Sequence, residues 1–152
     1  MVIMNRTKYD HWIPNWLKLS RHPDVVIGND YLQRWWILPR NRFFNIYLHR
    51  INQDDDGRAL HDHPWKNISI ILKGCYREIL PYFQPDYDGE CIWCWKTYGD
   101  YLFPGNIKYR NPLFSHRLEV ISGPVWSLFI TGPYKRDWGF HTKDGWVSHH
   151  NY

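Results

Sequence analysis

The segment GRALHDHPWKNISIILKG, residues 57–74, places a pair of histidines at the beginning of an apolar run. The run NISIIL is rich in β-branched residues and ends near Gly74, which is typical of a β-strand. His61 and His63 are two residues apart, so on a regular strand both imidazoles point to the same face. Two readings are open: the pair binds a metal ion, or the two side chains are exposed to solvent at a strand end.

The composition predicts an all-β protein. The chain has 152 residues, which suits one domain, and 18% of them are aromatic, with ten Trp, eleven Tyr and a single alanine. Eight short strand-like segments follow one another over residues 33–131, and turn residues separate them. This pattern predicts an antiparallel jelly-roll barrel. Among the separators, KG at 73–74 and SGP at 122–124 are expected to be turns, and residues 106–115 a loop.

The two ends of the chain lie outside this pattern. Residues 14–20 begin with Pro14 and bring Trp16 and Leu19 to one face, which predicts one short N-terminal helix. Residues 132–152 contain Trp138, Phe140 and several glycines, and we expect them to fold back as an aromatic tail over one end of the barrel. The whole chain, residues 1–152, is therefore expected to form a single domain.

Charge and cysteine content narrow the class of protein. Lys and Arg outnumber Asp and Glu by 19 to 15, but the basic residues are scattered, which favours a small anionic partner over nucleic acid. Three cysteines and no apparent signal peptide predict a cytoplasmic protein. CIWC, residues 91–94, resembles half of a zinc site, but no second pair accompanies it. No apolar segment approaches the roughly 20 residues of a transmembrane helix.

A metal site needs at least one ligand beyond the histidine pair, and His116 is the candidate. It stands at the start of a later predicted strand, which a jelly roll can lay beside the first. Neutral imidazoles suit Zn, Fe, Ni and Cu, and three of them leave coordination positions open for a substrate. The hypothesis is therefore a site formed by His61, His63 and His116.

These residues resemble the sequence motifs of the cupin superfamily. Its first motif is matched in order by Gly57, His61, His63, Asn67 and Gly74, and its second, more loosely, by Gly99, Pro104, Gly105 and His116. The C-terminal segment is similar to that of small single-domain cupin-like proteins of bacteria and their phages. The resemblance implies a cupin barrel with a divalent metal ion, Fe(II) first and Zn, Mn or Ni as alternatives, and a homodimer.

Asn67 departs from the family pattern, which has a glutamate ligand at this place. The resemblance therefore implies a three-histidine site, as in the cysteine-dioxygenase-like branch of the family, and a dioxygenase-like enzyme acting on a small molecule. Asn67 itself is a weak amide ligand, a residue that orients an imidazole by a hydrogen bond, or a buried amide bonded to the backbone. We favour the second of these roles.

Residues that contact a substrate are harder to choose from sequence. Asn45, Tyr47 and His49 share one face of the segment 42–51, and that face lines the barrel or faces solvent. We expect Tyr47, His49, Tyr101 and Arg117 to bind the substrate. Arg58, Arg110 and Arg117 all flank the expected site in sequence, although each is more often a solvated charge.

Two other classes of function fit the same sequence. One is a non-catalytic binding module, in which the aromatic barrel captures a small anionic or nucleotide-like ligand. The other is a structural or oligomeric protein that keeps the fold without a ligand, because a fold does not determine a function.

Overall fold

A computed structural model describes residues 2–4, 21–55, 59–81 and 97–152. These residues form antiparallel β-strands and contain no helix, which confirms the all-β prediction. The predicted helix at 14–20, Gly57, Arg58, and the pair Cys91 and Cys94 lie outside the described residues. Within the described part of the chain, no helix is available that could span a membrane.

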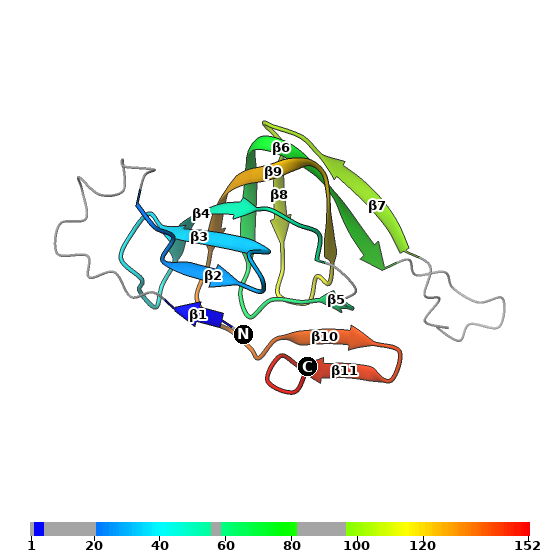
Figure 1. Cartoon of the computed structure of the whole chain (residues 1–152). Coiled ribbons are helices and arrows are strands. Elements are labelled where there is room, and N and C mark those ends of the chain that lie inside the picture. The colour runs from blue at the N-terminus through cyan, green and yellow to red at the C-terminus, as the bar shows by residue number, and fades with distance from the viewer. Residues whose placement is uncertain (1, 5–20, 56–58, 82–96) are drawn as a thin grey trace.

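The strands form two sheets. The larger one has the order β1-β2-β3-β4-β9-β6-β7, with β8 paired to β6 outside this path, and the smaller one has the order β11-β10-β5. Figure 1 shows that β6 and β9 arch together over the molecule and connect its two sides. The strand bounds are β1 Val2–Met4, β2 Val25–Ile27, β3 Leu32–Trp36, β4 Asn45–Ile51, β5 Leu60–His61, β6 Asn67–Pro81, β7 Thr97–Leu102, β8 Ile107–Arg110, β9 Arg117–Thr131, β10 Gly139–Thr142 and β11 Gly145–Ser148.

The two long strands bend where the sequence predicts turns. The predictions of turns at 73–74 and 122–124 are wrong, because β6 and β9 continue through these residues as paired strands. Their register shifts between Ile71 and Tyr76, and Gly74 has a positive φ of 78°. Bulges bend a strand without ending its pairing, so the glycine and proline residues serve a barrel corner here.

The expected loop at 106–115 is wrong for its first part. Residues 107–110 form β8 and pair with the first residues of β6. Three of the four β8 side chains are exposed or half-buried, and the one that points inward is Arg110. Apolar residues of this strand face solvent and a charged residue faces the interior, which is the reverse of the usual arrangement. For this reason the sequence pattern did not predict the strand.

The hydrophobic core also forms part of the wall of a cavity. Its buried residues are Leu32, Ile51, Ile71, Tyr76, Leu102, Leu118 and Val125. Four of them, from β3, β4, β6 and β9, also line the space inside the barrel that is described below. The same packing that stabilises the fold therefore shapes the candidate site.

The aromatic tail forms a hairpin of β10 and β11. Strand β10 pairs with β5, and Phe140 lies opposite His61 in the register. Figure 1 shows this hairpin beneath β5, at the open end of the arch. The side chain of Phe140 is buried, so the tail reaches the segment that carries the histidine pair.

Candidate metal centre and its cavity

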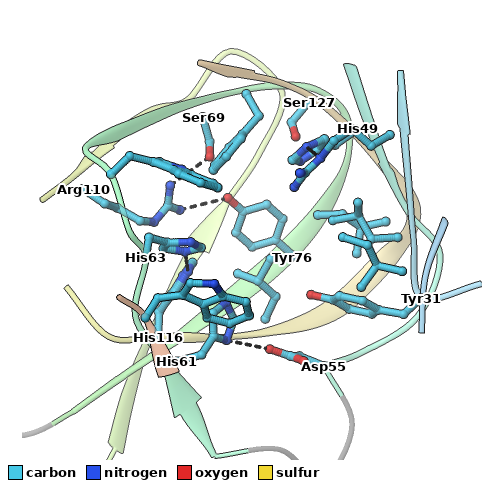
Figure 2. Close-up of a pocket in the computed structure, with 18 of the residues that line it drawn as sticks. Tyr31, His49, Asp55, His61, His63, Ser69, Tyr76, Arg110, His116 and Ser127 are labelled. Atoms are coloured by element: carbon cyan, nitrogen blue, oxygen red, sulfur yellow. Dashed lines mark hydrogen bonds and ion pairs between the residues drawn. The ribbon is translucent and has the colours of Figure 1, made fainter. Parts of the chain in front are cut away.

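A cavity of about 200 Å³ lies inside the barrel. Pockets that hold drug-sized ligands are usually larger, so this one suits a small molecule. Figure 2 shows His61, His63 and His116 at one end, with His49 and Ser127 at the other. Between them the wall is largely apolar and includes Tyr76, Phe129 and Leu118.

The three histidines come together from two segments that are far apart in the sequence. His61 ends β5, His63 follows two residues later, and His116 directly precedes β9. The backbones of His61 and His116 exchange two hydrogen bonds of 2.9 Å. One ring nitrogen from each of the three side chains lies within 4.8 Å of the others, a spacing at which all three could hold one metal ion.

Carboxylates lie close to Nδ1 of two of these imidazoles. Nδ1 of His116 contacts Oε1 of Glu78, and Nδ1 of His61 lies 3.0 Å from Oδ2 of Asp55. A carboxylate at Nδ1 fixes the orientation of the ring and leaves Nε2 as the nitrogen that can bind a metal. At the centre of the cluster, Nε2 of His63 lies 2.8 Å from Nε2 of His116.

The environment keeps two of the rings neutral. Burial, and then the neighbouring imidazoles of His116 and His61, hold the pKa of His63 well below its usual range. Burial and the positive charge of Arg110 do the same to the pKa of His116. Metal binding requires a neutral imidazole, so at neutral pH both rings have a lone pair to offer.

Arg110 and Glu78 form a buried ion pair behind His116. Nε of Arg110 lies 2.6 Å from Oε1 of Glu78, and both side chains are almost completely buried. The remaining guanidinium nitrogens donate to Oγ of Ser69 at 2.8 Å and to the hydroxyl of Tyr76 at 3.2 Å. Burial alone would lower the pKa of Arg110, but Tyr76 and Glu78 hold it above the ordinary value. Arg110 is thus a structural cation and not a solvated charge.

Asn67 lies one contact further from the histidines than the sequence suggests. Its Oδ1 accepts a weak hydrogen bond of 3.4 Å from Arg110, which in turn pairs with Glu78. One reason is that the histidine segment is not one regular strand: β5 ends at His61 and β6 begins at Asn67. The role of Glu78 was missed, although a glutamate within the apolar strand sequence YREIL was a signal that could have found it.

Asp62, between the two histidines of the pair, also escaped sequence reasoning. Its buried carboxylate accepts hydrogen bonds from Arg136 at 2.7 Å, from the backbone N–H of Gly139 at 2.8 Å and from Trp146 at 3.0 Å. Burial would raise the pKa of Asp62, but these bonds and a contact with His141 lower it far below the usual range. The carboxylate therefore ties the histidine segment to the C-terminal hairpin.

The structure separates the four expected substrate contacts. His49 lines the cavity and is 4% exposed, and Tyr47 is buried beside it, so the face of β4 that carries both residues points into the barrel. Tyr101 is 53% exposed on β7, and Arg117 pairs with Glu119 at 2.8 Å. Of the four, His49 lines the cavity, whereas Tyr47, Tyr101 and Arg117 do not.

A residue that the sequence did not single out, Arg34, lies at the far end of the cavity. It comes from β3, and its Nε donates to Nε2 of His49 at 2.8 Å. Its guanidinium also lies over the ring of Tyr47, at 4.7 Å from the centroid. Burial lowers the pKa of Arg34 to about 10, so the side chain is still positively charged at neutral pH.

Comparisons with known proteins identify the fold. No known family model matches the chain, and no curated protein matches its sequence. The solved structure of KdgF from Halomonas sp., a cupin-fold protein, is similar with a TM-score of 0.51, at 13% sequence identity over 72% of this chain and 85% of that one. The chain has the cupin fold.

Two other similar structures are also cupin-fold proteins. The oxalate decarboxylase of Bacillus subtilis at pH 4.6 has a TM-score of 0.48 and 13% identity, over 78% of this chain and 27% of that one. The DMSP lyase DddQ from Ruegeria pomeroyi DSS-3 has a TM-score of 0.47 and 16% identity, over 68% of this chain and 47% of that one. This chain thus spans about a quarter and about half of these two proteins. The oxalate decarboxylase contains Mn(II) centres.

Proposed function

We propose that this cupin protein is a metal-dependent enzyme that acts on a small molecule, with dioxygenase-like chemistry on Fe(II) as the first candidate. The observation that supports the proposal is the cluster of His61, His63 and His116 on the wall of a small cavity. The donors fit a divalent metal ion, because two of the imidazoles are held neutral and two have a carboxylate at Nδ1.

Each part of the site would have a separate task. A bound Fe(II) would supply open coordination positions for a substrate and dioxygen, whereas Zn, Mn or Ni would supply a Lewis acid. Glu78 holds the Nδ1 proton of His116, and Arg110 neutralises the charge of that carboxylate. The wall near Phe129 and Leu118 is apolar, so it offers few hydrogen bonds to water beside the rings.

One observation favours the alternative, a non-catalytic binding module. The 2.8 Å contact between Nε2 of His63 and Nε2 of His116 satisfies both nitrogens without a metal, if one ring donates and the other accepts. In that state the histidines and the aromatic wall would contact a small anionic or nucleotide-like ligand directly. The two proposals differ in one measurable quantity, the metal content.

Elemental analysis by plasma mass spectrometry tests the proposal. We expect about one equivalent of Fe, Zn, Mn or Ni in protein purified without chelator, and none in a folded His61→Ala/His63→Ala variant. The matched control is His149→Ala/His150→Ala, because these two residues and Asp137 form the other possible metal cluster among the described residues. Retention of the metal in the first variant, or a metal-free wild type after reconstitution, contradicts the enzyme proposal.

Glu78→Gln gives a second test of the same site. The glutamine keeps the shape of the side chain but removes the negative charge behind His116. Mutations at such supporting carboxylates typically weaken metal binding about 10- to 100-fold. Competition with a chelator measures the affinity, and an unchanged affinity would contradict the role of Glu78 in supporting His116 as a ligand.

The cellular location and assembly remain predictions from the sequence. We propose a cytoplasmic homodimer, and light scattering at high protein concentration tests the dimer. A monomeric mass under those conditions would contradict it.

A further inference from the structure

Two arginines line the cavity, and their surroundings differ. Arg110 is neutralised by Glu78 and also donates to Ser69 and Tyr76. Among the described residues, the contacts of the Arg34 guanidinium are with uncharged groups, the ring of Tyr47 and Nε2 of His49. No carboxylate in the described ranges of the chain forms an ion pair with Arg34, and neither of its two terminal NH2 groups donates a hydrogen bond to another described residue.

Arg34 is half-buried on the wall of the cavity. A cation that is partly withdrawn from water gains from an anionic partner, because the surroundings do not fully replace its hydration. His49 cannot supply the charge. Burial and the neighbouring Arg34 hold the pKa of His49 well below its usual range, so the ring is neutral. The hydrogen bond from Nε of Arg34 to Nε2 of His49 also fixes the orientation of the guanidinium. What remains available is the pair of terminal NH2 groups.

The position of Arg34 relative to the histidine cluster follows from the residues between them. The ring of His49 stacks on Phe129 at 4.7 Å between centroids, and the ring of Phe129 lies 6.2 Å from the ring of His63. Figure 2 shows His49 and Ser127 at the end of the cavity opposite His61 and His116. A charged end and a histidine end therefore face one apolar space of about 200 Å³.

We propose that Arg34 is the binding site for the carboxylate of a small organic acid, whose apolar part extends along Phe129 toward the three histidines. A guanidinium matches the planar carboxylate with two parallel hydrogen bonds. A single uncompensated cation suits a monoanionic head group better than a phosphate dianion, because Arg110 is already neutralised. Ser127, which lies opposite His49 in the pairing of β4 with β9, provides a hydroxyl at the same end. The binding of a carboxylate at Arg34 does not depend on the proposed function. The identification of this acid as the substrate of the enzyme does.

The test compares isobutyrate with isobutyramide, its neutral isostere, on metal-free protein by NMR titration. We expect the wild type to bind isobutyrate at least about tenfold more tightly than isobutyramide, and Arg34→Met to abolish that preference. The matched control is Arg50→Met on the next strand, which removes an arginine that does not line the cavity and should leave the preference intact.

Three results would overturn the proposal: equal binding of acid and amide by the wild type, no binding of isobutyrate, or an unchanged preference in Arg34→Met. Tighter binding of inorganic phosphate than of isobutyrate would overturn the choice of a carboxylate. The comparison within the wild type also holds if Arg34→Met fails to fold. Because the titration uses protein from which metal has been removed, a failure to bind isobutyrate is distinct from a failure of the histidine site, which the metal content reports.

Discussion

Substitution of Asp62 by asparagine tests whether the C-terminal hairpin holds the histidine segment in place. In the wild type the carboxylate accepts from Arg136, Gly139 and Trp146 at 2.7, 2.8 and 3.0 Å, and its side chain is 1% exposed. The asparagine side chain would keep one acceptor oxygen, and its NH2 group would face donors. Hydrogen bonds to a charged group each contribute about 1.5–3 kcal/mol, and a partly buried arginine loses its partner.

We therefore expect Asp62→Asn to lower the free energy of unfolding by about 3 kcal/mol, from the loss of one to two such bonds. Urea denaturation followed by tryptophan fluorescence measures this value, and the metal content of the folded variant reports the effect on the histidines. The control is Asp144→Asn, an exposed aspartate at the tip of the same hairpin, for which we expect a change within about 0.5 kcal/mol. If Asp62→Asn is as stable as this control, the hairpin does not depend on the carboxylate and the reasoning is refuted.

Two further substitutions test the interior and the barrel corner. Arg110→Met leaves the carboxylate of Glu78 buried without its partner, so we expect the free energy of unfolding, measured by urea denaturation, to fall by about 3–5 kcal/mol. The control is Arg42→Met at an exposed position, for which we expect little change. Equal stabilities of the two variants would contradict the buried pair. At Gly74 an added Cβ would lie 2.6 Å from a backbone oxygen of β9, whereas at Gly105, which also has a positive φ, it meets nothing within 4 Å. Gly74→Ala should therefore reduce the thermal midpoint clearly more than Gly105→Ala, and equal midpoints would exclude a close approach at the corner.

The sequence by itself determined the class of the fold and the histidine pair of the candidate site. Aromatic and β-branched content and frequent turn residues were sufficient for an all-β barrel, because these preferences act over a few neighbouring residues. The pair His61 and His63 was visible for the same reason. The motif spacing also pointed to His116, but only the bridge between the backbones of His61 and His116 showed that this residue lies beside the pair.

Tertiary structure alone decided which charged residues surround the cavity. Asp62 and Arg34 look in the sequence like ordinary charges, and Glu78 stands out only as a charge within an apolar strand. The partners of these three residues are 15 to 84 residues away along the chain. The pairing of β3 with β4 places Arg34 opposite His49, and the pairing of β6 with β9 brings Glu78 near His116. The C-terminal hairpin brings its donors to Asp62. A local pattern reports how a residue suits its own strand, whereas the energy of a buried charge depends on groups that only the folded barrel brings within a few ångströms.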